Sequence, residues 1–230
     1  MSATMSTLIE RYIPQADADA ARRLTAYSQM LLTANTHMNL TAITDPEEIV
    51  LKHFVDSLTA SPYIPQGARC IDVGTGAGFP GIPLLIMRPA IGMTLMDSTQ
   101  KRVGFLTDTT AKLGLEASCV CARAETLSHD VTHREQYDIA LARAVAPLRV
   151  LLEICTPFVK PGGVFIAYRG KHARDESNEA GFAANILHCR IKLVPLTVSY
   201  GARTLALVEK LAPTPSVYPR KAGDPARKPL

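Results

Sequence analysis

DVGTGAGFPG, residues 72–81, joins an apolar, β-rich segment at 69–73 to a helical segment at 81–88. A glycine-rich loop at such a junction can present backbone N–H groups to a ligand. The stretch matches the dinucleotide-binding pattern G-x-G-x-x-G over 76–81, and it also reads D-x-G-x-G-x-G from Asp72. A bare turn seldom needs four glycines in eight residues, as this stretch has. The stretch therefore predicts a ligand site at the end of a strand.

The segments around this loop alternate short apolar runs with helical stretches. The apolar runs lie at 69–73, 93–97, 116–121, 137–143 and 163–169, and the helical stretches at 81–88, 99–113, 148–159 and 173–188. Such alternation is typical of a parallel sheet covered on both faces. Two further strands, near 189–199 and 203–210, are joined by too few residues for a crossover helix, so we expect them to pair antiparallel. The predicted fold class is α/β, a Rossmann-like, mostly parallel seven-stranded sheet with an antiparallel last strand.

The chain has 230 residues, the length of one large domain or of one domain with a small helical addition. Residues 1–62 have helical periodicity, with Asp45 capping a helix that starts at Pro46, and are expected to form an N-terminal helical extension. Residues 63–211 form the predicted ligand-binding domain. Residues 212–230 contain five prolines and are expected to be an irregular basic tail. Together these parts make effectively one structural domain.

Composition excludes several protein classes. Hydrophobic residues are 47% and charged residues 20%, as in an ordinary globular protein. No apolar run approaches the roughly 18 residues of a membrane helix, and Glu10 and Arg11 stand where a signal peptide would be apolar. The five cysteines form no C-x-x-C pair and have no histidine at metal-ligand spacing. We therefore expect a cytoplasmic chain with reduced thiols, no metal and no membrane contact.

The charge is unevenly distributed. Residues 1–60 carry four basic and seven acidic side chains, whereas residues 211–230 carry four basic and one acidic. A basic C-terminal half suits a nucleic-acid partner.

Two cofactor classes are compatible with the loop. Asp97 lies ~20 residues beyond it, where a carboxylate can accept hydrogen bonds from ribose hydroxyls, so a nicotinamide enzyme is a competitor. Three details favour S-adenosylmethionine instead. Asp72 would repel a pyrophosphate but attract a methionyl ammonium, the glycines alternate at 74, 76 and 78, and Pro80 and Pro83 remove N–H donors from the first helical turn.

Eight stretches together resemble the bacterial 16S rRNA (guanine-N7) methyltransferase family, RsmG, also called glucose-inhibited division protein B (GidB). They are NLTAI (39–43), EEIVLKHFVDSL (47–58), DVGTGAGFPGIPL (72–84), TLMDSTQKRVGFL (94–106), RAE (123–125), ARAVAPL (142–148), KPGG (160–163) and YPRKAGDPARKPL (218–230). They follow the family order over most of the chain. One departure is Arg169, which precedes Gly170 where the family has a lysine. The resemblance implies a class I methyltransferase fold with an N-terminal helical extension.

The loop and the strand ends supply the expected S-adenosylmethionine contacts, which are Asp72, Gly74, Gly76, Gly78, Phe79, Asp97, Ala124, Glu125 and Arg143. The glycines let the backbone approach the methionyl part, and Asp97 is chosen for the ribose. The resemblance implies that Phe79 and Arg143 line the site and that the loop with Ala124 and Glu125 holds the adenine.

Each of these assignments has a structural alternative. Phe79 can be core packing at a helix start, and Asp97 can cap the helix that begins at Thr99. Arg143 closes an apolar strand and can pair with Glu125 or Asp97. No catalytic residue is predicted with certainty, and Arg143 is the nearest candidate.

The candidates for RNA contact are His53, Lys101, Arg102, Arg123, Lys160, Arg169, Lys171, Arg220 and Lys221. Basic side chains can contact phosphates, but each can equally be a solvated surface charge. His53 and Asp56 lie three residues apart on a helix, where a surface ion pair is the alternative to substrate contact.

The absence of two motifs narrows the choice of the atom that accepts the methyl group. No Asn/Asp-Pro-Pro-aromatic turn follows the 137–143 strand, and Cys155 lies in the middle of a helix, poorly placed for a nucleophile. Guanine N7 carries no proton and needs no general base. The resemblance to the family implies methylation of N7 of one guanine, nucleotide 527 of 16S rRNA. It implies that the substrate is the small ribosomal subunit or its precursor and that the product of the cofactor is S-adenosylhomocysteine. The alternatives are an NAD-dependent oxidoreductase and a non-catalytic RNA-binding module.

Overall fold

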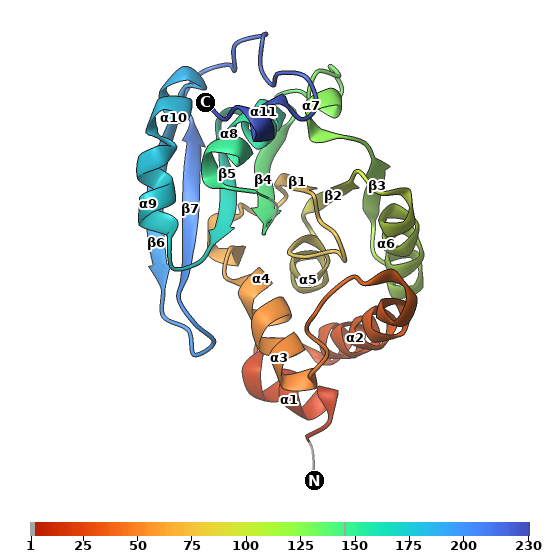
Figure 1. Cartoon of the computed structure of the whole chain (residues 1–230). Coiled ribbons are helices and arrows are strands. Elements are labelled where there is room, and N and C mark those ends of the chain that lie inside the picture. Colours follow the sequence, from red (N-terminus) through yellow and green to blue (C-terminus); the bar gives the residue numbers. More distant parts are fainter. Residues whose placement is uncertain (1–2, 145) are drawn as a thin grey trace.

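The computed structural model describes residues 3–144 and 146–230 and contains one seven-stranded sheet (Figure 1). The strands are β1 (Arg69–Val73), β2 (Gly92–Asp97), β3 (Ala117–Cys121), β4 (Tyr137–Arg143), β5 (Val159–Arg169), β6 (Cys189–Leu196) and β7 (Arg203–Lys210). Their order is β3-β2-β1-β4-β5-β7-β6, and β7 runs antiparallel to both of its neighbours. The predicted fold class is confirmed.

The four predicted helical stretches are present, two of them with differences, and a short helix after β3 was not predicted. They are α5 (Gly81–Met87), α6 (Gln100–Leu113), α7 (Ala124–Leu127), α8 (Leu148–Cys155), α9 (Ala173–Glu179) and α10 (Gly181–Ile186). The stretch at 173–188 is two helices, because α9 ends before Gly181, a poor helix former. The stretch at 148–159 ends in a 3-10 turn (Thr156–Phe158) with Pro157, so β5 starts at Val159, earlier than predicted.

The N-terminal helices are α1 (Met5–Tyr12), α2 (Ala18–Met38), α3 (Pro46–Ile49) and α4 (Asp56–Leu58), and a 3-10 turn (Ser61–Tyr63) leads into β1. Side chains of α2 such as Leu24 and Leu31 are fully buried in the same apolar cluster as Leu95 of β2 and Leu141 of β4. A second cluster lies on the other face of the sheet, beneath α8 and α10. Because α2 packs against α5 and α6, which cover this face of the sheet, the N-terminal helices share a core with the sheet that carries the glycine loop.

A π-helix, η1 (Val50–Val55), separates α3 from α4. The sequence pattern predicted one continuous helix starting at the Asp45 cap, and the cap is present because Asp45 accepts a hydrogen bond from the Glu48 N–H. π-turns are rare and occur frequently at functional sites. This one places His53 and Asp56 in the interior, with exposed fractions of 9% and 3%. The predicted surface ion pair between them is therefore wrong.

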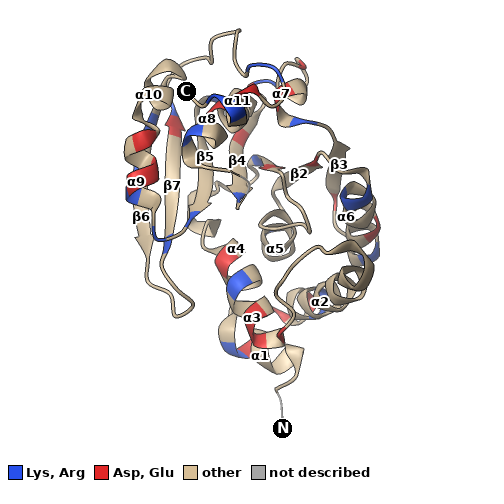
Figure 2. Ribbon diagram, in the orientation of Figure 1, with Lys and Arg blue, Asp and Glu red and all other residues tan. Residues whose placement is uncertain are grey.

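The C-terminal segment folds back over the face covered by α8 and ends in a short helix, α11 (Asp224–Arg227). Blue ribbon in Figure 2 marks basic residues on this segment and on α6. Arg220 holds the segment in place, because its guanidinium and its backbone N–H all donate to Glu153 of α8, which is 1% exposed. Arg134 adds hydrogen bonds to the carbonyl oxygens of Thr214 and Tyr218. Among the described residues, no helix is long and apolar enough to cross a membrane.

Replacing Arg220 with alanine is expected to lower the free energy of unfolding by about 3 kcal/mol, because it leaves the Glu153 carboxylate buried without its cation. Urea denaturation measures this loss. The matched control is Lys221→Ala, an exposed neighbour, for which the change is expected to stay within about 0.5 kcal/mol. Equal stabilities of the two variants would contradict the role given to Arg220.

Candidate active site

The glycine loop between β1 and α5 has a left-handed backbone at three positions, Gly74 (φ 71°), Gly76 (φ 60°) and Gly78 (φ 106°). A Cβ atom on Gly78 would lie 2.4 Å from Ile82 Cδ1 and 2.8 Å from the Tyr27 hydroxyl, whereas one on Gly76 would meet open space. Only glycine suits Gly78 on both counts. At Gly76 only the left-handed backbone conformation favours glycine.

Asp72 lies beneath the loop and is fully buried. Its Oδ2 accepts hydrogen bonds from the Gly81 N–H (2.8 Å) and the Thr75 hydroxyl (2.5 Å). Its Oδ1 is buried and receives no hydrogen bond from a described residue. Burial raises the pKa of Asp72 to about 6, against the hydrogen bonds from Thr75 and Gly81, which lower it. Oδ2 of Asp72 thus holds the loop, and Oδ1 is an acceptor without a hydrogen-bond donor among the described residues.

Asp97, the last residue of β2, links the loop to α6. Its Oδ2 accepts from the Gly76 N–H (3.1 Å) and lies 3.4 Å from Arg102 Nη1, and its Oδ1 accepts from the Thr99 N–H (2.9 Å). The expected contact at the start of the helix is present, although α6 begins at Gln100 with Thr99 as its N-cap residue. Asp97 is 3% exposed, so most of its surface is already in contact with these groups.

The ring of Phe79, at the end of the loop, packs against a second group of side chains. The His53 ring stacks on it with centroids 4.4 Å apart, and Arg143 Cζ lies 5.0 Å from its centroid. Tyr27 and Phe54 pack around it, with centroids 5.3 and 6.3 Å away. Phe79 is 6% exposed, so the core-packing interpretation describes its surroundings well.

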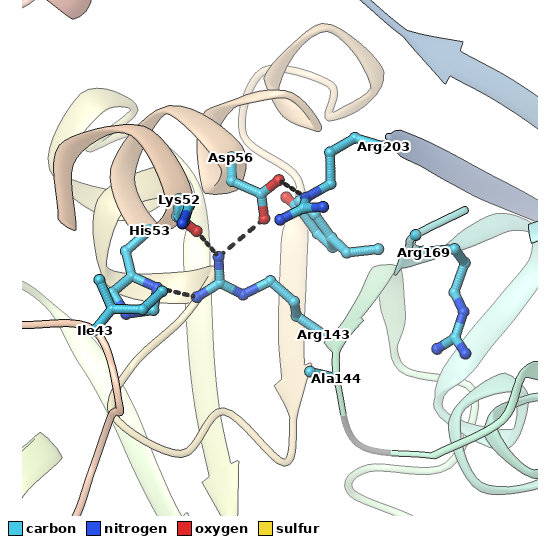
Figure 3. Close-up of a pocket in the computed structure, with 10 residues that line it drawn as sticks. Ile43, Lys52, His53, Asp56, Arg143, Ala144, Arg169 and Arg203 are labelled. Atoms are coloured by element: carbon cyan, nitrogen blue, oxygen red, sulfur yellow. Dashed lines mark hydrogen bonds and ion pairs between the residues drawn. The ribbon is translucent and has the colours of Figure 1, made fainter. Parts of the chain in front are cut away.

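Arg143, at the carboxyl end of β4, points into the π-helix (Figure 3). Its Nη1 donates to Asp56 Oδ2 and to the Lys52 carbonyl oxygen, both at 3.0 Å, and its Nη2 lies 3.2 Å from His53 Nδ1. The expected partners Glu125 and Asp97 were wrong, because the end of β4 faces η1 and α4. The second oxygen of Asp56 accepts from Arg203 Nε at 3.0 Å.

A cavity of about 370 Å³ opens at this cluster. It is lined by Ile43, Lys52, His53, Asp56, Arg143, Ala144, Tyr168, Arg169, Gly170 and Arg203. Four of these side chains are cationic and one is a carboxylate. Such a cavity can hold a polar, hydrogen-bonding group that carries negative charge or carbonyl oxygens.

His53 is a neutral member of this cluster. Burial and the charge of Arg143 lower its pKa to about 3. The neutral ring accepts from Arg143 at Nδ1, so Nε2 carries the proton and donates to the Thr41 hydroxyl at 2.8 Å.

The loop after β3 differs from expectation in one respect. Ala124 begins α7 and is buried, as a residue beneath a ligand would be. The carboxylate of Glu125 accepts from the Gly223 N–H at 3.0 Å, so it binds the C-terminal segment.

The basic candidates separate into two groups. Lys101, Arg102, Arg123, Lys171 and Lys221 are exposed. Arg169 pairs with Glu176 and donates to the Ala146 carbonyl oxygen, and Arg220 pairs with Glu153. Lys160 lies near the amino end of β5 and pairs with Asp138 near the amino end of β4. Lys160 therefore lies at the amino ends of the parallel strands, whereas the glycine loop follows the carboxyl end of β1.

Among the lining residues that the sequence pattern did not indicate, Lys52 and Arg203 supply hydrogen-bonding groups. Lys52 contributes its carbonyl oxygen, for which a sequence carries no signal. Arg203 is the first residue of β7, and the predicted antiparallel pairing brings the start of that strand beside the end of β5. Within 3–144 and 146–230, no cluster of three His, Cys, Asp or Glu side chains is arranged to bind a metal.

His53 is expected to stay neutral between pH 5 and 8. Its folded-state pKa lies below the unfolded value, so its contribution to stability is present above about pH 6.5 and is lost as the pH falls toward about 3. NMR titration of the ring carbons measures this, with His53→Gln identifying the signal. A titration midpoint near the ordinary histidine value of about 6.5 would contradict the contact with Arg143.

Comparisons with known proteins agree with this geometry. The family model GidB, described as rRNA small subunit methyltransferase G, matches residues 20–204. The ribosomal RNA small subunit methyltransferase G of Alkaliphilus metalliredigens is 46% identical, covering 93% of this chain and 92% of its own length. That of Desulforamulus reducens is 47% identical, over 89% and 88%.

Solved structures share the fold at low identity. A methyltransferase from Pyrococcus furiosus superimposes with a TM-score of 0.59 at 14% identity, covering 83% of this chain and 98% of its own. A SAM-dependent methyltransferase from Aquifex aeolicus gives 0.54 at 17%, over 71% and 93%. The chain therefore belongs to the rRNA small subunit methyltransferase G family.

Proposed function

We propose that this chain transfers a methyl group from S-adenosylmethionine to N7 of one guanine in 16S rRNA, nucleotide 527 in the family's pattern. Family membership supports rRNA methylation. The observation that carries the proposal is that Phe79, which ends the glycine loop, packs on His53 and Arg143, two of the residues that line the basic cavity. A cofactor bound at the loop and a base bound in the cavity would then lie close enough for direct transfer.

The residues of the loop suit S-adenosylmethionine, which when bound supplies an electrophilic methyl group on a sulfonium. The open space at Gly76 leaves room for the methionyl part beside the backbone of Gly74 and Gly78. The methionyl ammonium would donate a hydrogen bond to the unsatisfied Oδ1 of Asp72. Asp97 at the end of β2 is the residue proposed for the ribose hydroxyls, which would compete with its 3.4 Å contact to Arg102, and the backbone of Ala124 is proposed to contact the adenine.

The cavity suits a guanine base. The guanidinium groups of Arg143 and Arg203 can donate to a base carbonyl, and Asp56 holds both of them in place. The N7 lone pair needs no base to remove a proton, and the lone pair of His53 is already used by Arg143. Catalysis would then come mainly from positioning, which can lower a barrier by several kcal/mol. Because N7 faces the deep major groove of A-form RNA, the target base must be unpaired or extruded.

The partner is 16S rRNA in the small ribosomal subunit or its precursor, in the cytoplasm. The exposed side chains of Lys101, Arg123, Lys171 and Lys221 are available for phosphate contacts. Arg102, Arg220 and Lys160 contribute less, because each is paired with a carboxylate.

A nicotinamide cofactor is disfavoured by one contact. The N–H of Gly81, the first residue of α5, donates to buried Asp72, so it is withdrawn from a pyrophosphate that would bind at this helix end. A non-catalytic RNA-binding module would be expected to leave the loop without affinity for S-adenosylhomocysteine.

The purified protein is expected to transfer a labelled methyl group from S-adenosylmethionine to unmodified 16S rRNA or small subunits, and to bind S-adenosylhomocysteine but not NADH. A transcript with 7-deazaguanosine in place of guanosine should accept no label, because it lacks the N7 nucleophile. Labelling of the deaza transcript would exclude N7 as the target. Binding of NADH alone would contradict the cofactor, and binding of neither would favour the non-catalytic module.

A further inference from the structure

Tyr27 of α2 connects the N-terminal helices to the glycine loop. Its side chain is fully buried, and its hydroxyl donates to the Ala77 carbonyl oxygen at 2.7 Å, across 50 residues of sequence. Its ring packs against Phe79 and stacks on Phe54. Burial raises the pKa of Tyr27 well above its ordinary value, so the hydroxyl keeps its proton and remains a donor.

The Ala77 carbonyl belongs to the same peptide group as the Gly78 N–H. That N–H donates to the Thr75 carbonyl oxygen at 2.9 Å. The peptide group is therefore held on both sides, by Tyr27 through its oxygen and by Thr75 through its nitrogen. This peptide joins Ala77 to the left-handed Gly78, whose dihedral freedom would otherwise permit the peptide to rotate.

Other restraints come from within the loop, where the Phe79 N–H also donates to the Thr75 carbonyl oxygen, and from the sheet. Gly74 and Thr75 donate to the Met96 carbonyl oxygen, Gly76 donates to Asp97, and Asp72 accepts from Gly81. These groups hold the beginning and the end of the loop. Tyr27 is the described side chain that holds the Ala77 carbonyl, and it comes from the N-terminal segment.

We propose that Tyr27 is a positioning residue for methyl transfer. Its hydroxyl fixes the Ala77–Gly78 peptide and so keeps the glycine loop in the conformation that binds the methionyl part of the cofactor. This inference rests on the proposed function. It gives the N-terminal helices a part in cofactor binding without any contact to the cofactor.

Tyr27→Phe in the full chain tests this, with Tyr137→Phe as the matched control. Tyr137 is also fully buried and its hydroxyl is also hydrogen-bonded, to His133 at 2.6 Å, but it lies at the amino end of β4. Hydrogen–deuterium exchange of the peptide spanning 74–79 and calorimetric titration with S-adenosylhomocysteine are the two measurements.

The expected result is about fivefold faster loop exchange and about fivefold weaker S-adenosylhomocysteine binding in Tyr27→Phe, the effect of one lost hydrogen bond. Both should stay at wild-type values in Tyr137→Phe. Wild-type exchange and affinity in Tyr27→Phe, or equal losses in the two variants, would overturn the proposal. If the wild-type protein binds no S-adenosylhomocysteine, the proposed function fails, and the exchange rates alone decide whether Tyr27 holds the loop.

Discussion

The ring of Phe79 is the contact on which the rest of the site depends. It ends a loop that is tied to buried Asp72 and Asp97, and it forms the surface on which His53 and Arg143 lie. A single aromatic side chain therefore connects the glycine loop to two residues that line the basic cavity. Because protein interiors are close-packed, a shift of this ring would displace both the glycine loop and the side chains of His53 and Arg143.

The N-terminal helices complete this arrangement from outside the sheet. Tyr27 reaches the loop, and the π-helix carries His53 and Asp56 to the end of β4. Asp56 lies between two arginines, and removing it would leave two partly buried positive charges side by side. The cavity is thus formed jointly by the N-terminal segment and the sheet, so neither part forms it alone.

The sheet could be predicted well because its strands are short, apolar runs bounded by Gly, Pro or Asp, and because the loop at 72–81 marks the strand–helix junction. The partner of Arg143 could not, since it depends on the π-turn, whose extra residue per turn is set by packing and not by local propensity. Tyr27 has the signature of a core residue on a helix, and nothing in the sequence indicates where its hydroxyl points. The same holds for Glu125 and Arg220, which bind across the fold.

The most direct test of this account compares Phe79→Leu with Phe54→Leu, a buried neighbour in the same aromatic cluster that lies outside the loop. S-adenosylhomocysteine affinity is measured by calorimetry and 16S rRNA affinity by filter binding, alongside unfolding in urea. The account predicts that both variants lose stability, and that only Phe79→Leu weakens the binding of cofactor product and of RNA together. Loss of only one of these affinities, or equal losses in the two variants, would contradict the claim that Phe79 supports both the cofactor site and the RNA site.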